Sequence, residues 1–464
     1  MKFPSDFHWG AATSSYQIEG AVNADGRGPS IWDTFCATPG KVANQESGEV
    51  ACDHYHRFSE DIAIMKDMGV DSYRFSISWS RLFPNGDGQR EERGFAFYHR
   101  LINELIANGI EPVITLYHWD LPQALQDNGG WANREIVATF SDYAAACVAE
   151  FGDRVSKWIT LNEPWVFTWL GHLAGVHAPG IQDIGAATAS AHHTALAHAQ
   201  ASHAMRAVNP NIEVGIALNM TTYRVTELEN SELTQIETLL DGHLNRWWLD
   251  AMFYGQYPTE VVAELGEHLA KVSLPGDQEL LITNPDFIGV NYYADNFISS
   301  AKSDTYANGD GSPIPFAVKF DGSAPLPHTD MGWPITPDGF YELLVRINRD
   351  WPMVTNISIT ENGAAFPEGP NVTGEVADDR RVAYLESHIA AVSSAIADGV
   401  PVKSYFAWSL MDNFEWAEGY AKRFGLVHVD FDTLKRTPKN SAKFYRNVIA
   451  QQRALGNPAL IPAK

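Results

Sequence analysis

The sequence predicts a single-domain α/β fold, a (β/α)₈ (TIM) barrel over residues 1–464, from three observations. Short apolar segments of strand length alternate with segments of helical hydrophobic spacing along the chain. Eight strand candidates occur, the number that closes such a barrel. Polar and aromatic side chains follow these strands, at the end where barrels of this class carry their functional residues. A doubly wound sheet, the competing fold, would be expected to show a glycine-rich phosphate turn, and none is present.

The N-terminal half of the chain supplies four strand candidates, at 7–12, 72–79, 111–120 and 159–164. Helical spacing of apolar residues lies between them, at 56–68, 95–108 and 134–151. Segment 72–79 is the clearest strand, because apolar residues alternate with Arg74, Ser76 and Ser78. One face of this strand should therefore meet apolar surroundings, while the other turns an arginine into a polar environment.

The C-terminal half continues the alternation, with strand candidates at 213–220, 287–293, 357–363 and 402–409. Helices are predicted at 184–208, 233–253, 338–349, 378–397 and 438–454. The segment 296–335 is rich in glycine, proline, serine and aspartate and is predicted to be a long loop. Loops of that length in compact domains are usually functional or disordered. We therefore expect long loops after the strands to form the entrance to a site.

Composition and charge exclude several classes of partner. Hydrophobic residues make up 45% and charged residues 19% of the chain, as expected for a globular protein with a large core. With 33 basic and 57 acidic residues, the formal net charge of −24 disfavours binding to nucleic acid or to a membrane surface. No signal peptide and no apolar run of about 18 residues is visible. Three cysteines without CxxC spacing are typical of buried thiols in a reducing compartment, so we expect a cytoplasmic protein.

Two glutamates at predicted strand ends are the strongest candidates for chemistry. Glu163 follows a short apolar run and precedes Pro164, which has no N–H to give a sheet and so ends the strand. Glu361 has the same setting, with Gly363 as the terminator. One such glutamate could be a structural ion pair, but two of them, each with an adjoining asparagine, favour function. Hydrolysis of a glycosidic bond needs one protonated and one ionised carboxyl group.

Several segments resemble one known family in the same order along the chain. They are 7–20 (FHWGAATSSYQIEG), 73–79 (YRFSISW), 117–120 (YHWD), 160–164 (TLNEP), 291–293 (NYY) and 359–363 (ITENG). The family is glycoside hydrolase family 1, the β-glucosidase family. The resemblance extends from about residue 3 to about residue 450 and implies the same barrel fold.

The resemblance implies a retaining mechanism with Glu163 as general acid/base and Glu361 as nucleophile. In retaining enzymes the two carboxyls lie roughly 5–5.5 Å apart. The charge of Glu361 should raise the pKa of Glu163, and Arg74 is a cation that could hold a glutamate ionised. Tyr293 would orient the nucleophile together with Arg74, and Asn162 would hold the sugar 2-hydroxyl.

Further residues are assigned to the sugar by the same resemblance. The predicted substrate-binding set is Gln17, His118, Trp119, Asn162, Asn291, Tyr293, Trp408, Glu415, Trp416 and Phe424. Their amide, imidazole, indole and carboxylate groups discriminate between hydroxyl orientations, and the aromatic rings offer apolar faces to the sugar. The predicted aglycone entrance is formed by Trp165, Phe167, Leu170, His177 and Trp333.

Glu415 bears on the class of substrate. Relatives that take 6-phosphorylated sugars have a serine at this position, because a carboxylate would repel the phosphate. Lys422 and Tyr420 lie where those relatives keep a lysine and a tyrosine, so a 6-phospho-β-glucosidase remains an alternative. The thioglucosidase variant, with glutamine as its acid/base residue, is disfavoured by Glu163. A catalytically silent sugar-binding barrel would be expected to lack one of the two glutamates.

The expected activity is therefore hydrolysis of terminal, non-reducing β-D-glucosyl residues from β-glucosides and short cello-oligosaccharides, as in cellulose degradation. The sequence leaves open whether glucose is preferred over galactose or fucose, and whether the chain forms a homo-oligomer. No cofactor is implied, because a proton donor and a carboxylate nucleophile supply the chemistry. No metal is implied either. His192, His193, His198 and His203 match no HExxH spacing and lie among alanines, which favours structural or surface roles.

Overall fold

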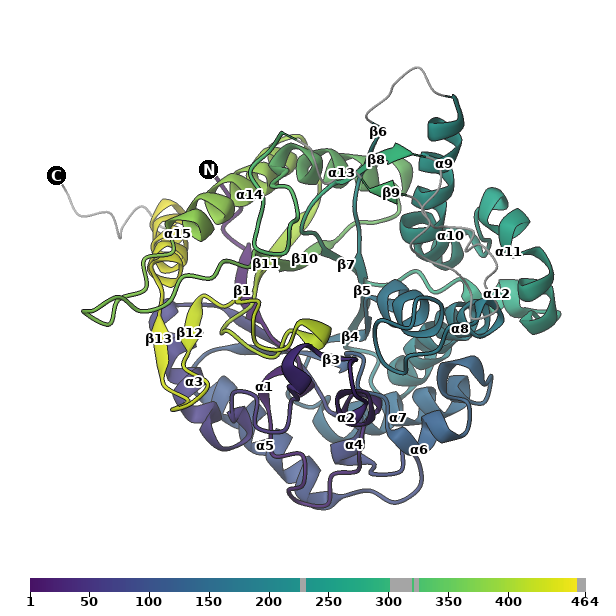
Figure 1. Ribbon diagram of the computed structural model, residues 1–464, viewed down its shortest axis with the longest axis horizontal. Coiled ribbons are helices and arrows are strands. Elements are labelled where there is room, and N and C mark those ends of the chain that lie inside the picture. Colours follow the sequence, from purple (N-terminus) through teal and green to yellow (C-terminus); the bar gives the residue numbers. More distant parts are fainter. Residues whose placement is uncertain (226–230, 301–318, 321–324, 457–464) are drawn as a thin grey trace.

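The structure, a computed structural model, describes residues 1–225, 231–300, 319–320 and 325–456. Its centre is a closed barrel of parallel strands in the order β1-β11-β10-β7-β5-β4-β3-β2, ringed by helices (Figure 1). The strands are β1 (His8–Ala12), β2 (Ser72–Ser76), β3 (Glu111–Tyr117), β4 (Lys157–Asn162), β5 (Glu213–Asn219), β7 (Phe287–Asn291), β10 (Ile357–Asn362) and β11 (Val402–Trp408). All eight predicted strands are present, and the predicted barrel is confirmed.

The predicted helices form the outer ring. They are α3 (His54–Met68), α5 (Glu92–Ala107), α7 (Ile136–Phe151), α8 (Ile184–Val208), α13 (Pro337–Asp350), α14 (Asp379–Ala397) and α15 (Asn440–Gly456). Helix α8 begins where the Asp183 carboxylate accepts a hydrogen bond from the Ala186 N–H at 2.6 Å, which caps free backbone donors of the first turn. Helix α13 begins with Pro337, whose fixed φ suits the first helical position.

Several predicted elements differ from the structure. The strand predicted over 111–120 ends at Tyr117. The strand predicted over 72–79 ends at Ser76, and Trp79 begins the short helix α4 (Trp79–Leu82). The Trp79 indole N–H donates to the Gly86 carbonyl at 2.8 Å and the ring stacks on Tyr143, so tertiary contacts take this residue away from the strand. The helix predicted over 233–253 is divided into α9 (Ser231–Asp241), the π-helical turn η4 (Gly242–Arg246) and α10 (Trp247–Tyr254).

Several elements were not predicted. They include α1 (Ser15–Ile18), α2 (Ile31–Ala37), α6 (Gln123–Asp127), α11 (Thr259–Val272), α12 (Asp277–Leu281) and the hairpin β12 (Val427–Val429) with β13 (Arg436–Pro438). The predicted loop at 296–335 begins with β8 (Asn296–Ser300), which pairs with β6 (Tyr223–Val225) and β9 (Lys319–Phe320). Residues 301–318 and 321–324 of that loop lie outside the described residues.

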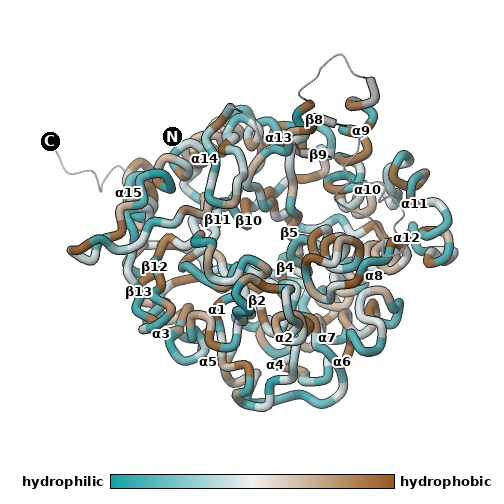
Figure 2. The backbone as a smooth tube through the Cα atoms, in the orientation of Figure 1, coloured by the Kyte–Doolittle hydropathy of each residue, from teal (hydrophilic) through white to brown (hydrophobic). Residues whose placement is uncertain are grey.

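The apolar core of the described residues has two main parts and a small third cluster around Phe366. A large cluster fills the space between the barrel and the helices, and a smaller one, with Ala12, Val113, Ile159 and Phe287 among its members, fills the barrel. Hydrophobic segments accordingly line the strands in Figure 2, while polar segments lie on the outer turns. Filling of the barrel interior leaves the carboxyl ends of the strands as the place for a polar site.

Other sequence expectations concern cysteines, membranes and metals. Cys36, Cys52 and Cys147 are all buried and free. Among the described helices, none combines the length and the apolar character that crossing a membrane requires. The described residues contain no group of three or more histidines, cysteines or carboxylates placed to hold a metal ion.

Candidate active site

Glu163 lies at the carboxyl end of β4, in an unusual backbone conformation. The strand ends at Asn162, and Glu163 adopts a φ of 47° in the left-handed region, where non-glycine residues are strained. Its N–H still donates to the Ala217 carbonyl of β5 at 2.8 Å. The side chain is 6% exposed. The turn before Pro164 thus directs a carboxyl group over the barrel mouth.

Glu361 lies near the carboxyl end of β10, at an irregularity in the strand register. Ile359 pairs with Val290 and Glu361 with Asn291, so one residue of β10 is extra. Gly363 follows, and a Cβ there would lie 1.8 Å from the Trp408 carbonyl oxygen, so only glycine fits. The Glu361 side chain is 4% exposed.

The fully buried Arg74 of β2 connects β10 with β4. Its Nη1 donates to Glu361 Oε1 at 2.8 Å, and its Nη2 donates to Asn162 Oδ1 at 2.6 Å. Its Nε donates to Thr115 Oγ1 at 3.1 Å. A guanidinium is planar and rigid, so these bonds fix the position of Glu361 relative to β4.

Asn291 and Tyr293, from the end of β7, distinguish the two glutamates. The Tyr293 hydroxyl donates to Glu361 Oε2 at 2.6 Å. The Asn291 Nδ2 donates to Glu163 Oε1 at 2.9 Å and to Asn162 Oδ1 at 3.0 Å. Glu361 therefore has a direct cationic partner and a hydroxyl donor, whereas Glu163 has a neutral amide.

These partners set the protonation of the pair. Burial, and then the nearby charge of Glu361, raises the pKa of Glu163 to about 8. Burial also raises the pKa of Glu361, but the charge of Arg74 and the hydrogen bond from Tyr293 oppose that rise. These surroundings favour the proton on Glu163 and the negative charge on Glu361. Such a pair could supply one acid and one nucleophile or base.

A third carboxyl group, that of Glu415, completes the polar part of the site. Gln17 Nε2 lies 3.4 Å from Glu415 Oε2 and donates to the Phe414 carbonyl at 2.9 Å. Burial raises the pKa of Glu415 to about 8, with the charge of Glu361 adding to the rise. The raised pKa weakens the negative charge that the sequence predicts at this position. Among the described residues, no cation acts on the pKa of this carboxyl.

Aromatic rings form a wall beside the carboxyls. His118 stacks between Trp408, at 5.7 Å, and Trp416, at 5.9 Å between ring centroids. Burial and the charge of Arg74 lower the pKa of His118 well below its usual value, so its ring is neutral. The Trp119 indole N–H donates to the Asn162 carbonyl at 3.0 Å and is thus used within the protein. Trp408 and Phe424 belong to one apolar cluster with Tyr293 and Trp333.

Comparison with known proteins identifies the family. The family model for glycosyl hydrolase family 1 matches residues 1–454. The chain belongs to this family. It is 46% identical to beta-glucosidase A of Acetivibrio thermocellus over 97% of this chain and 98% of the relative. It is 44% identical to beta-glucosidase A of Thermotoga maritima, again over 97% and 98%.

Solved structures of family 1 proteins agree. The family 1 β-glucosidase from Thermotoga maritima superposes with a TM-score of 0.91 at 44% identity, covering 97% of this chain and 99% of that one. The same enzyme in complex with glucoimidazole gives a TM-score of 0.92 with the same coverage and identity.

Only some of the residues predicted to form the aglycone entrance of this family 1 barrel lie close together. Trp333 packs against Tyr293 at 5.4 Å and His177 against Trp119 at 5.5 Å, measured between ring centroids, and both are half-buried beside the aromatic wall. Trp165 and Leu170 are half-buried at the two ends of the π-helical turn η3 (Val166–Leu170).

Phe167 does not lie where the prediction of the entrance placed it. It is 1% exposed and packs against Tyr117 and Trp131 in the core. The π-helical turn directs its ring inward, away from the barrel mouth, while its neighbour Trp165 stays half-exposed.

The histidines of α8 have structural partners, as the sequence favoured. His192 contacts the Tyr257 hydroxyl and the Asp277 carboxylate, and Arg134 pairs with the same carboxylate. His193 contacts the Trp131 carbonyl, and His198 contacts the Thr160 hydroxyl. His203 lies on the exposed side of the helix.

Sequence reasoning did not single out two residues that contact the site. Thr360 Oγ1 donates to Asn291 Oδ1 at 2.6 Å. Asn413 accepts a hydrogen bond from Gln17 Nε2 at 3.1 Å. Thr360 directly precedes Glu361, and Asn413 closely precedes Glu415. Their places in the family motifs could therefore have indicated that both residues lie at the site.

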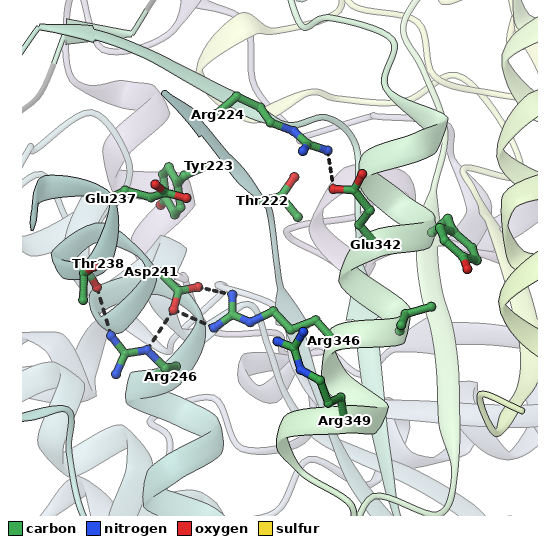
Figure 3. Close-up of a pocket in the computed structure, with 12 residues that line it drawn as sticks. Thr222, Tyr223, Arg224, Glu237, Thr238, Asp241, Arg246, Glu342, Arg346 and Arg349 are labelled. Carbon is green, nitrogen blue, oxygen red and sulfur yellow. Dashed lines mark hydrogen bonds and ion pairs between the residues drawn. The ribbon is translucent and has the colours of Figure 1, made fainter. Parts of the chain in front are cut away.

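A second concavity, the outer cleft, lies between α9 and α13 outside the barrel (Figure 3). Its volume is about 710 Å³, and its charged lining residues are Arg224, Glu237, Asp241, Arg246, Glu342, Arg346 and Arg349. Arg224 pairs with Glu342 at 2.7 Å, and Asp241 pairs with both Arg246 and Arg346. These pairs link the two walls of the cleft and neutralise most of its charge.

Proposed function

We propose that the chain is a retaining β-glucosidase that removes terminal, non-reducing β-D-glucosyl residues from β-glucosides and short cello-oligosaccharides. One observation carries the proposal: two buried carboxyls, at the carboxyl ends of β4 and β10 in the same barrel, have unlike partners. Glu163, whose pKa burial and the charge of Glu361 raise to about 8, contacts a neutral amide, whereas Glu361 contacts Arg74 and Tyr293, which oppose the rise in its pKa. Family 1 relatives with 44–46% identity are named β-glucosidases, which supports glucose as the sugar.

In the first step a Glu361 carboxylate oxygen attacks the anomeric carbon, and the bond from that carbon to the leaving oxygen breaks. Glu163 gives its proton to the leaving oxygen, so the aglycone departs as a neutral alcohol. The sugar is then esterified to Glu361, and Glu163 is left ionised. Loss of the charge on Glu361 removes one cause of the raised pKa of Glu163, which suits the following step.

In the second step the ionised Glu163 takes a proton from a water molecule while the water oxygen attacks the anomeric carbon. The bond to Glu361 breaks, its carboxylate is restored, and the sugar leaves with its original β configuration. Arg74 and Tyr293 stabilise the departing carboxylate through the bonds they make to its two oxygens.

The glycone is bound, in this proposal, by Gln17, His118, Asn162, Glu415 and Trp416, with Trp408 and Phe424 packing on its apolar face. The carboxyl of Glu415 and the amide of Gln17 are held together, so both can reach neighbouring hydroxyls. The unpartnered Nδ1 of His118 is a further free polar atom within the described site. Trp119 contributes through its ring, since its N–H is used by Asn162.

The alternative, a 6-phospho-β-glucosidase, would need free cationic or hydroxyl groups for the phosphate. Lys422 Nζ instead donates to the Asp330 carbonyl at 2.7 Å, and the Tyr420 hydroxyl donates to the Ser47 carbonyl at 2.7 Å. Both groups are thus used to hold loops together, which supports a neutral 6-hydroxyl. Both glutamates of a catalytic pair are present, which disfavours a silent sugar-binding barrel.

The test is release of 4-nitrophenol from 4-nitrophenyl β-D-glucoside, with Glu361→Ala as the control for a contaminating activity. Proton NMR of the first sugar formed should show the β anomer, and the α anomer would overturn retention. No turnover by a folded sample would overturn the activity. Parallel rates on the β-galactoside, the β-fucoside, cellobiose and cellobiose 6′-phosphate decide the sugar and the phosphate question.

We further propose that the chain acts as one catalytic domain in the cytoplasm, on small sugars and without a nucleic-acid or membrane partner. A net charge of −24 and three buried free thiols support this setting. Activity recovered from the cytosolic fraction of the source cells is the expected result, and activity confined to the culture medium would contradict it. Light scattering measures whether the chain forms a homo-oligomer.

A further inference from the structure

Thr360 directly precedes the nucleophile in β10, and its side chain is completely buried inside the barrel. A Cβ on Gly289 of β7 would come within 2.8 Å of both its Oγ1 and its Cγ2. The absence of a side chain at Gly289 therefore leaves the space that Thr360 fills. A β-branched side chain packed in this way has one favoured orientation.

The hydroxyl of Thr360 stabilises the orientation of the Asn291 amide. It donates to Asn291 Oδ1 at 2.6 Å, so the Nδ2 end of that amide faces Glu163 Oε1 at 2.9 Å and Asn162 Oδ1 at 3.0 Å. The reverse orientation would place Oδ1 against two acceptor oxygens, and the Thr360 hydroxyl supports the observed orientation by donating to Oδ1. A buried group with unlike ends is held most firmly when each end has its own partner.

We propose that Thr360 is a positioning residue for the acid/base carboxyl, because its hydroxyl keeps the Asn291 N–H directed at Glu163. This inference rests on the proposed role of Glu163 as general acid/base. Thr360 would act through Asn291, and neither residue would form or break a bond. The contact matters twice in each turnover, since Glu163 is neutral in the first step and ionised during the second.

A donor aimed at a carboxyl stabilises its ionised form. The N–H of Asn291 thus limits the rise in the pKa of Glu163 that burial and the charge of Glu361 produce. The other groups that act on this carboxyl are Arg74, which lowers its pKa, and Glu415, which raises it. Loss of the Thr360 hydroxyl would let the amide turn or move away, and either change would raise the pKa of Glu163.

The test uses Thr360→Val, which keeps the shape of the side chain and loses the hydroxyl. The alkaline limb of kcat/KM against pH, which reports the acid in the free enzyme, should move upward by about 0.5 to 1 pH unit. Thr360→Ser, which keeps the hydroxyl, should restore the limb to its original position. Thr360→Ala provides a second variant without the hydroxyl if the valine variant does not fold.

Thr160→Val is the matched control. Thr160 is equally buried in β4, and its hydroxyl contacts His198 outside the site. The Thr160→Val substitution should at most lower the melting temperature, and it should leave the alkaline limb of kcat/KM in place. A purely structural role of Thr360 predicts the same outcome for Thr360→Val, with kcat/KM scaled down equally at every pH, and that result would overturn the inference.

Glu163→Gln separates failure of the inference from failure of the proposed function. With an activated aryl glucoside, this variant should lose the alkaline limb altogether. If the limb persists, it belongs to another group such as Glu415, and both the acid assignment and the inference are wrong. If the limb is lost in Glu163→Gln yet unmoved in Thr360→Val and Thr360→Ala, the inference alone fails.

Discussion

The active site and the outer cleft are built from the same residue types, carboxylates and arginines. Carboxylates predominate in the active site, and arginines in the outer cleft. In the outer cleft the Asp241 carboxylate accepts hydrogen bonds from Arg346 at 2.5 and 2.7 Å and from Arg246 at 2.8 Å. In the active site the guanidinium of Arg74 opposes the rise in the pKa of Glu163 and of Glu361, and within the described part of the chain no cation acts on the pKa of Glu415.

This difference in proportion decides how the carboxyls behave. Burial tends to raise the pKa of Asp241 as well, yet its two arginines hold that pKa below the usual value. Three carboxyls with one guanidinium have no such compensation, and the pKa values of Glu163 and Glu415 rise to about 8. Burial together with unbalanced charge, and not concavity, therefore distinguishes a site of chemistry from a structural cleft.

The largest expected effect is that of removing the nucleophile. Glu361→Ala should lower kcat by about 10⁵-fold or more on every glycoside, because no carboxylate remains to attack the anomeric carbon. Steady-state assays on an aryl glucoside and on cellobiose measure it. Retention of activity within tenfold of the parent would assign the nucleophile elsewhere.

Next in size is the loss of the acid. Glu163→Gln should reduce kcat/KM by about 10²- to 10⁴-fold for cellobiose, whose leaving group needs a proton. Activated aryl glucosides, which leave without one, should lose far less in the first step. Comparing 2,4-dinitrophenyl β-glucoside with cellobiose provides the measurement. Equal losses on both would contradict the acid role.

Tyr293→Phe removes one of the two groups that keep Glu361 ionised. A hydrogen bond to a charged group contributes about 1.5–3 kcal/mol, so kcat/KM should fall by roughly 10- to 100-fold. Because the ionised form loses a donor, the pKa of Glu361 should rise, and the acidic limb of kcat/KM should move to higher pH. An acidic limb that moves to lower pH would contradict this arrangement.

The smallest effect on activity is expected from the outer cleft. Asp241→Asn should lower the free energy of unfolding by about 1–2 kcal/mol, since Asp241 is 9% exposed and its arginine partners are more exposed, and should leave kcat/KM unchanged. Denaturant unfolding and the glucoside assay give both values. A tenfold loss in kcat/KM would show that the cleft is coupled to the site.

The difference in the free energy of unfolding between the parent and Asp241→Asn should also depend on pH, in a predictable direction. Its folded-state pKa lies below the usual value, so its ion pairs stabilise the fold above about pH 4. That contribution is lost as the pH falls through the folded-state pKa. The difference between the parent and Asp241→Asn should therefore shrink on acidification, and a difference that grows would contradict the pairing.

Much of the fold was predictable because its signals are local. Helix α8 has the predicted bounds, since a long alanine-rich run of helical spacing needs no distant partner. Trp79 was assigned to a strand because it continues an alternation, and only its contacts with Gly86 and Tyr143 show that it begins a helix. Phe167 was assigned to the entrance from its place in the motif, and the π-helical turn η3 buries it instead.

The amino-acid sequence by itself determined the barrel, the family resemblance and the two glutamates at strand ends, because each depends on residues close together in the chain. Tertiary structure decided which glutamate keeps its proton. The pKa of a buried carboxyl depends on its neighbours in space, and these are distant in sequence: Arg74 lies 287 residues from Glu361, and Asn291 lies 128 residues from Glu163. Closure of the barrel brings these residues together, and with them the division of labour between acid and nucleophile.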